Sequence, residues 1–222
     1  MGKRVVIIGA GGHAREVLDI LLTCRASGDN VEPLGFIDEN PDRHGQIVVG
    51  FPILGDFRWF KGVDRNELEV ICAVGTPETC RRLVQRARTL GLRFANAISP
   101  RACISAHARI GQGVIVFPNV VISTGAIVGD HVTLNVAVTV SHDTVVGDFC
   151  NINPGAHLAG NVTVGEGCYI GMGANVIQNI AIGPWSIIGA GAAVTQNIPS
   201  HVTAVGVPAR VIKAHGEEKP HV

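Results

Sequence analysis

The chain has 222 residues, of which 46% are apolar, and its 18 lysines and arginines equal its 18 aspartates and glutamates in number. This length allows one large domain or two small ones, and the apolar content suffices for a core. Because the formal net charge is zero and apolar runs long enough to span a bilayer are absent from the sequence, we expect binding neither to nucleic acid nor to a membrane.

Predicted strands and helices alternate over the first ninety-odd residues. An apolar strand over 3–8 is followed by the loop Gly9-Ala10-Gly11-Gly12-His13 and by an amphipathic helix over 14–24. Thr76 and Pro77 are typical of a helix start, and Gly91 lies beyond the expected end of that helix. The remaining expected strands cover 33–37, 46–51, 68–74 and 93–98. This alternation predicts a parallel sheet covered by helices.

A repeat with a period of six follows. From Ile98 to Val194 every sixth residue is Ile, Val or Leu, which makes seventeen hexads without an insertion, and the residue four positions later is usually small. A period of six fits neither an α-helix nor an alternating strand. It fits a solenoid in which each hexad is one short strand and three hexads close one coil. We expect the large aliphatic side chains inside the prism and the small ones at its corners.

The six cysteines form no CxxC pair and no short Cys/His ligand spacing, so we expect no metal site. Cys150 and Cys168 occupy small-residue positions of the hexads and are expected in the core. The first residues, MGKRVVIIGAGG, read as a strand rather than as a signal peptide. We therefore expect a cytoplasmic protein with reduced thiols.

The hexad array resembles the hexapeptide-repeat acyltransferases, and residues 205–210, VGVPAR, match the ending of those enzymes. With the N-terminal Gly9-x-Gly11-Gly12-His13 unit, the chain is similar over essentially its whole length to the sialic acid O-acetyltransferase and nucleotide-4-aminosugar N-acetyltransferase family. The resemblance implies a Rossmann-like α/β domain that binds a nucleotide sugar over residues 1–97, a trimeric left-handed parallel β-helix over 98–198, and a C-terminal tail over 199–222.

The activity that this resemblance implies is acetyl transfer from acetyl-CoA to the 4-amino group of a UDP- or GDP-linked 4-amino-4,6-dideoxysugar, for surface glycan synthesis. Acetyl-CoA is then a co-substrate, and no cofactor is tightly bound. The family pattern places a His followed by an acidic residue in mid-solenoid, which here is His142 and Asp143. It implies that His142 is the general base and that Asp143 orients its ring; the alternative for His142 is an exposed turn residue.

Gly160 follows His142 by 18 residues, which is one full coil, so the repeat alone predicts that the two lie side by side. The resemblance implies that the Gly160 N–H stabilises the oxyanion. Some relatives carry a second His nine residues after the base, where this chain has Asn151. Asn135 falls where relatives have an asparagine near the sugar, but an ordinary turn residue is an equal alternative.

The glycine-rich loop allows two interpretations. Backbone N–H groups of such a strand-to-helix turn can approach a phosphate, and we expect Gly11, Gly12 and His13 to hold the nucleotide diphosphate or sugar. Asp38 and Glu39 are expected near the base or ribose. The alternative is a tight turn without a ligand. A nicotinamide site is disfavoured because the domain has too few elements for two mononucleotide-binding halves.

By the same resemblance, acetyl-CoA lies between neighbouring solenoids of a homotrimer, against Gly160, Gly189, Ala190 and Pro208, with Lys213 near a phosphate. The main alternative function is O-acetylation of a sugar such as sialic acid, which would use the same fold and base. A zinc carbonic anhydrase is disfavoured, because no two of the solenoid histidines are 18 or 36 residues apart. A scaffold without catalysis is disfavoured by the His-Asp pair.

Overall fold

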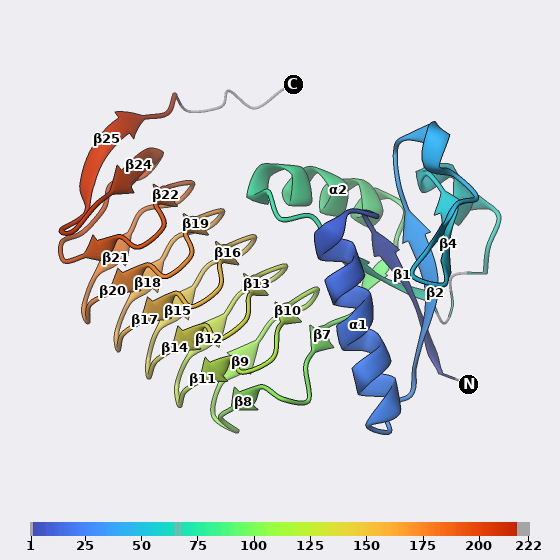
Figure 1. The fold of residues 1–222 in the computed structure, drawn as a ribbon, viewed down its shortest axis with the longest axis horizontal. Helices are drawn as coiled ribbons and strands as arrows, with labels where there is room; N and C mark the ends of the chain where they lie inside the picture. Colours follow the sequence, from blue (N-terminus) through green and yellow to red (C-terminus); the bar gives the residue numbers. More distant parts are fainter. Residues whose placement is uncertain (1, 65, 67, 217–222) are drawn as a thin grey trace.

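The computed structural model describes residues 2–64, 66 and 68–216, and it contains two parts in series. An α/β domain lies against the first coils of a long solenoid of parallel strands (Figure 1). None of the helices in the described part of the chain is long and apolar enough to cross a membrane.

The α/β domain contains a six-stranded sheet in the order β3-β4-β2-β1-β5-β6. Its strands are β1 (Lys3–Ile8), β2 (Val31–Ile37), β3 (Ile47–Val48), β4 (Phe51–Gly55), β5 (Leu68–Cys72) and β6 (Arg93–Phe94). The helices are α1 (Gly12–Ala26) and α2 (Pro77–Thr89), with 3₁₀ helices at Pro41–Arg43 and Phe57–Lys61. β1 pairs in parallel with β2 on one side and with β5 on the other. The strand order therefore reverses at β1, and sheets of this kind bind ligands outside the carboxyl ends of their strands at such a point.

Three local expectations for this domain need correction. The single strand expected over 46–51 is a hairpin of β3 and β4, because Val49 and Gly50 have φ of 44° and 81° and form a two-residue turn. Thr76 occupies the N-cap position of α2 but makes no side-chain capping bond. The strand expected over 93–98 is divided, because the chain leaves the sheet after Phe94 and enters the solenoid at Ala97.

The solenoid contains seventeen two-residue strands, one for each predicted hexad. They are β7 Ala97–Ile98, β8 Cys103–Ile104, β9 Arg109–Ile110, β10 Ile115–Val116, β11 Val121–Ile122, β12 Ile127–Val128, β13 Thr133–Leu134, β14 Thr139–Val140, β15 Val145–Val146, β16 Asn151–Ile152, β17 His157–Leu158, β18 Thr163–Val164, β19 Tyr169–Ile170, β20 Asn175–Val176, β21 Ala181–Ile182, β22 Ile187–Ile188 and β23 Ala193–Val194. Every third strand joins the same sheet, so three sheets form the faces of a prism. Partners in neighbouring coils are 18 residues apart, as with Ile115 and Thr133.

The core of the solenoid follows the hexad pattern. The second residue of each strand points inward, and Leu134, Ile152 and Ile170 are fully buried. The small corner residues Cys150 and Cys168 are fully buried as well, so these thiols belong to the core as expected. A large aliphatic and a small residue alternate because the corner of each coil leaves no room for a second large side chain.

The residues after the last hexad extend the stack. β24 (Val202–Val205) pairs in parallel with β22, and β25 (Arg210–Ala214) pairs antiparallel with β24. The first part of the expected tail is thus a hairpin on the end of one sheet. Residues 217–222 of that tail lie outside the described residues.

Turns between the three faces form three edges along the prism. In the coil that begins at β13 these turns are 135–137, 141–143 and 147–149, and each edge repeats its turn every 18 residues. We name the edge that contains 135–137 the cradle edge, the edge that contains 141–143 the dyad edge, and the edge that contains 147–149 the α2 edge. The third residue of each turn in this coil has a φ near +60°.

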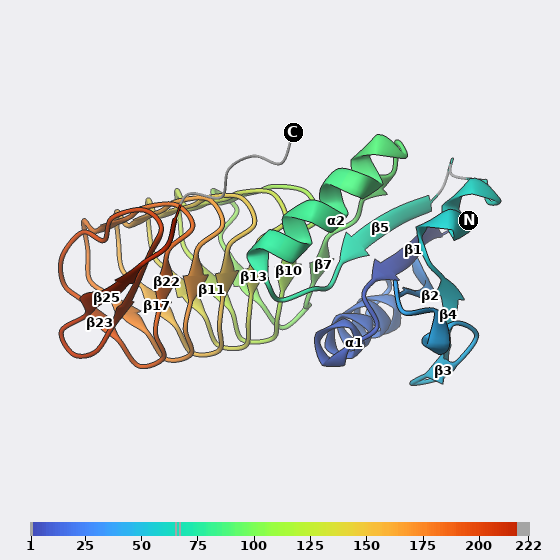
Figure 2. The same cartoon turned by 90° about the horizontal axis from the view of Figure 1, so that it is seen from above.

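Helix α2 lies along the α2 edge, beside β7, β10 and β13 in Figure 2. Arg88 Nη2 is 3.3 Å from His131 Nε2, and the His131 ring stacks on Phe149 with centroids 5.2 Å apart. Further along, the Arg81 guanidinium lies 5.2 Å from the centroid of the Trp185 ring. These contacts join the α/β domain to several consecutive coils.

Candidate active site

His142 and Asp143 project from the dyad edge, between β14 and β15. His142 Nδ1 lies 3.0 Å from Asp143 Oδ2, and the two side chains are 57% and 62% exposed. Asp143 has a φ of 58°, a conformation that Asp tolerates better than most residues. Because a carboxylate can only accept, the geometry assigns the ring proton to Nδ1 and leaves a lone pair on Nε2.

Gly160 lies directly against this ring, as the 18-residue spacing predicts. A Cβ at position 160 would fall 2.5 Å from both His142 Cε1 and Nε2, so only glycine fits beneath the ring as it is placed. Within the described residues the Gly160 N–H has no hydrogen-bond partner. The predicted oxyanion donor and the predicted base therefore lie in neighbouring coils side by side.

Gly125 is a neighbour of Asp143 that the sequence analysis missed. It lies one coil before Asp143, and a Cβ there would fall 2.4 Å from Asp143 Oδ1. The same arithmetic that pairs Gly160 with His142 would have identified it, applied in the opposite direction from Asp143.

The glycine-rich loop lies at the carboxyl end of β1, at the predicted phosphate position. Gly11 is the N-cap of α1, is exposed, and leaves the helix without a side-chain cap. The first N–H groups of α1 are thus open to an anion. Gly12 and His13 line an open hollow of ≈ 440 Å³, which is bordered on its other side by Val49 of the β3–β4 turn.

His13 connects this loop to the solenoid. Its ring stacks on Phe117 of the cradle edge with centroids 5.7 Å apart, and Nδ1 lies 3.7 Å from Glu16 Oε2. Burial lowers the pKa of His13 below its usual value, while Glu16 opposes the shift. The ring is therefore neutral near pH 7. Its Nε2 is buried and has no hydrogen-bond partner among the described residues.

Asp38 and Glu39 lie at the end of β2, and both are already paired. Asp38 Oδ2 is 2.7 Å from Arg43 Nη1, and Oδ1 accepts the Asn40 N–H at 3.0 Å. The other guanidinium nitrogen of Arg43 donates to Ala10 O at 2.8 Å, which joins Asp38 to the glycine-rich loop. Glu39 Oε2 is 2.7 Å from Arg86 Nη1 on α2.

Two asparagines on the solenoid differ in their surroundings. Asn135 lies one coil after Phe117 on the cradle edge, and its Oδ1 accepts the adjacent Val136 N–H at 2.8 Å. Asn151 is buried, and its Nδ2 donates to Gly75 O at 2.6 Å. It thereby ties the loop after β5 to the solenoid, while its Oδ1 has no partner in the described chain.

The residues expected at acetyl-CoA lie in two places. Gly189 and Ala190 belong to the cradle edge, and a Cβ at Gly189 would meet Val205 Cγ1 at 2.7 Å. Pro208 and Lys213 lie on the terminal hairpin, where both are exposed. Gly160, by contrast, is on the dyad edge. The residues expected at acetyl-CoA thus form two groups. One group lies on the cradle edge and the terminal hairpin, and Gly160 lies on the dyad edge.

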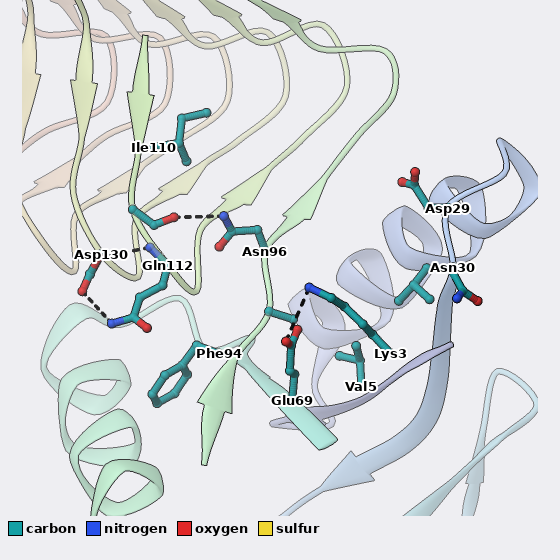
Figure 3. A pocket seen from close by; sticks show the side chains of 13 residues that line it. Lys3, Val5, Asp29, Asn30, Glu69, Phe94, Asn96, Ile110, Gln112 and Asp130 are labelled. Atoms are coloured by element: carbon teal, nitrogen blue, oxygen red, sulfur yellow. Dashed lines mark hydrogen bonds and ion pairs between the residues drawn. The ribbon is translucent and has the colours of Figure 1, made fainter. Parts of the chain in front are cut away.

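A larger hollow of ≈ 700 Å³ lies between the α/β domain and the first coils (Figure 3). Several of its polar side chains are bound to one another or to backbone: Lys3 Nζ lies 3.5 Å from Glu69 Oε1, and Asn96 Nδ2 donates to Gly111 O at 2.9 Å. It contains none of the expected site residues. In the described part of the chain, no group of three or more His, Cys, Asp or Glu could hold a metal ion.

Comparison with known proteins gives matches to both parts of the chain. Residues 4–87 match the model of the PglD N-terminal domain, and residues 143–178 match that of the bacterial transferase hexapeptide with six repeats. No match was found among curated proteins.

Several solved structures match nearly the whole chain. The acetyltransferase domain of PglB from Neisseria gonorrhoeae FA1090 is 34% identical, has a TM-score of 0.87, and is matched over 95% of this chain and 100% of that one. It is also solved in complex with acetyl coenzyme A. PerB from Caulobacter crescentus, in complex with CoA and GDP-perosamine, is 36% identical with a TM-score of 0.84, over 93% of this chain and 96% of its own.

WeeI from Acinetobacter baumannii AYE is 27% identical, with a TM-score of 0.84 over 94% of this chain and 99% of its own. The GDP-perosamine N-acetyltransferase of Caulobacter crescentus is also solved as variants in which a histidine is replaced by alanine or asparagine. These matches confirm the predicted fold class, an α/β domain followed by a left-handed parallel β-helix.

Proposed function

Because the chain belongs to the family of hexapeptide-repeat sugar acetyltransferases with a PglD-type N-terminal domain, we propose that it transfers the acetyl group of acetyl-CoA to the 4-amino group of a nucleotide-linked 4-amino-4,6-dideoxysugar. The observation that carries this proposal is the His142–Asp143 pair, with Nε2 of the ring directly above Gly160. The relatives solved with acetyl coenzyme A and with GDP-perosamine support the choice of both substrates.

The geometry accounts for each proton in the reaction. With the Nδ1 proton held by Asp143, Nε2 accepts a proton from the sugar amine as its nitrogen attacks the thioester carbonyl. The Gly160 N–H donates to the oxygen that becomes negative in the tetrahedral intermediate. When the C–S bond breaks, the proton on Nε2 passes to the departing CoA thiolate. The amide product and free CoA are released, and the imidazole returns to its starting form.

The α/β domain supplies the site that we propose for the nucleotide. The loop after β1 offers the open N–H groups of α1 to the diphosphate. The carboxyl ends of β1 and β5, where the strand order reverses, lie near the solenoid, because His13 stacks on Phe117 and Asn151 bonds Gly75. A sugar attached to a nucleotide bound there would therefore extend along the solenoid towards the acetyl donor.

We further propose a homotrimer in which each active site is shared by two subunits. In one chain His13 packs against the cradle edge, whereas His142 projects from the dyad edge, which is one face of the prism away. A threefold axis can bring the dyad edge of one solenoid beside the cradle edge of the next. The reaction would take place in the cytoplasm, which fits free thiols at the cysteines.

O-acetylation of a sugar hydroxyl, as in a sialic acid O-acetyltransferase, is the second candidate. The same base could take a proton from a hydroxyl, so the dyad does not separate the two reactions. The open phosphate-binding loop favours a nucleotide-linked acceptor, which free sialic acid is not.

An assay of CoA release tests the proposal. Purified protein would be given acetyl-CoA with UDP- and GDP-linked 4-amino sugars and with free sialic acid, as wild type and as His142→Ala. We expect turnover on one nucleotide amino sugar and a fall in kcat of roughly 10²- to 10⁴-fold in the variant, because the general base is lost. His107→Ala is the matched control, since this exposed histidine lies on the same edge two coils before Asp143.

The outcomes are distinct. Turnover with sialic acid alone would assign the protein to the O-acetyltransferases. Full activity of His142→Ala on a nucleotide amino sugar would leave the reaction correct and refute the assignment of the base.

A further inference from the structure

Gly125 faces the Asp143 carboxylate across the step between two coils. An ideal Cβ at position 125 would lie 2.4 Å from Asp143 Oδ1 and 3.4 Å from Cγ. Side-chain carbons do not approach an oxygen this closely. Any residue other than glycine at 125 therefore excludes the carboxylate from the position in which it bonds His142.

We propose that Gly125 is a positioning residue of the active site. Because Gly125 has no side chain, the Asp143 carboxylate has room to lie against His142 Nδ1. In this position the carboxylate keeps the proton on Nδ1 and the lone pair on Nε2. This inference rests on the proposed function for the role of His142, but the placement of the proton can be measured independently of activity.

Gly125 has a φ of +72°, which by itself favours glycine, but its contact with Asp143 differs from the contacts of other solenoid glycines. Gly129 also faces a carboxylate, that of Asp148, and there the Asp148 oxygen accepts the Asp130 N–H of the preceding coil at 2.8 Å. This hydrogen bond between Asp148 and Asp130 stabilises the backbone of two neighbouring coils. Asp143 makes no such bond: among the described residues the hydrogen-bond partner of its carboxylate is His142.

Other glycines make room for rings that contact α2. A Cβ at Gly113 would collide with His131, and one at Gly167 with Trp185. A substitution there would disturb the packing of α2. The Asp143 side chain is 62% exposed, so it can swing into solvent when Gly125 is replaced. The expected effect at Gly125 is thus on the dyad rather than on the fold.

Replacement of Gly125 should change the tautomer of the His142 ring. Once the carboxylate is displaced, the neutral His142 ring no longer has an acceptor at Nδ1, and the Nε2–H tautomer becomes accessible. That tautomer cannot take a proton at Nε2. We expect Gly125→Ala to lower kcat by roughly ten-fold or more, while KM for both substrates stays close to that of wild type, because no substrate contact is removed.

The test combines ¹⁵N NMR of histidine-labelled protein with steady-state kinetics on wild type, Gly125→Ala, Asp143→Ala and the double variant. His142→Gln identifies the ring signals of His142. We expect Gly125→Ala and Asp143→Ala to shift the His142 ring nitrogens in the same direction, away from the Nδ1–H tautomer, and the double variant to show no further shift and no further loss of kcat.

Gly91→Ala controls for backbone strain. Gly91 has a φ of +68°, close to the +72° of Gly125, and a Cβ there meets nothing within 4 Å. This variant should retain the wild-type tautomer and kcat, at a modest cost in stability.

A wild-type tautomer in Gly125→Ala would overturn the inference, whatever the activity. The inference would also be overturned if Gly125→Ala failed to fold while the double variant, which lacks the carboxylate as well, folded. In that case the Asp143 carboxylate would be held too rigidly to move into solvent. Failure of both variants to fold would mean that the glycine serves the backbone. A wild-type protein without acetyltransferase activity would refute the proposed function alone, since the NMR result still decides the role of Gly125.

Discussion

Gly160 has no side chain, and this leaves the room that the His142 ring occupies. Its φ lies outside the left-handed region, so alanine introduces no backbone strain there. Its Cβ would nevertheless fall 2.5 Å from two atoms of the His142 ring. Because that ring is 57% exposed, it can turn into solvent. We expect Gly160→Ala to lose roughly 10²-fold or more in kcat while its free energy of unfolding changes by less than about 1 kcal/mol.

Kinetics and urea unfolding of the same preparation measure both quantities. A protein that is destabilised in proportion to its loss of activity would contradict this expectation, because Gly160 would then be needed for packing rather than for the position of the base.

The contact between α2 and the solenoid contains a buried neutral histidine. His131 is 4% exposed, and its pKa is lowered to about 4, first by burial and then by the Arg88 charge, while Asp130 opposes the shift. His131 binds a proton below about pH 6.5 in the unfolded chain, but only below about pH 4 in the folded chain. The free energy of unfolding should therefore fall as the pH drops through this window, by at most about 3 kcal/mol from this residue.

His131→Phe removes the titration and keeps a ring in the stack. Phe149 occupies the equivalent position one coil later with a φ of 60°, so the conformation accepts phenylalanine. Urea unfolding at several pH values should show a flatter acid side for this variant than for wild type. An unchanged slope would mean that other groups cause the acid sensitivity.

At the scale of the whole molecule, the distance between the two site groups predicts complementation between subunits. Gly11→Asp should fold, because Asp is a favourable N-cap and position 11 is open, but its charge should repel the proposed diphosphate. His142→Ala should lack the proposed base. If a site takes its cradle from one subunit and its dyad from the next, each trimer that contains both variants has one intact site of three and should regain about one third of wild-type activity.

Co-expression of the two variants with different affinity tags, followed by assay of the doubly tagged trimers, measures this recovery. Gly11→Ser serves as the neutral control and should remain active alone. Mixed trimers without activity would show that each subunit holds a complete site.

The sequence by itself determined the solenoid and the contacts within it. Neighbouring coils are always 18 residues apart, so the partner of any residue follows from its number, and Gly160 beside His142 was predicted in this way. Gly125 beside Asp143 obeys the same rule. A regular repeat converts a tertiary contact into a sequence spacing, which is why the position of Gly160 beside His142 could be predicted from the sequence, whereas the roles of His142 and Asp143 came from the family resemblance.

Only the tertiary structure decided how the α/β domain meets the solenoid. Asn151 bonds Gly75 across 76 positions, Arg88 reaches His131 across 43, and Arg43 bonds Ala10 across 33. These separations share no period, because they depend on how two separately folded surfaces dock. Side chains on such surfaces have no partner that local sequence can predict. The glycine-rich loop could therefore be placed between β1 and α1 from the sequence, whereas its hydrogen bond to Arg43 and its position against the solenoid required the folded chain.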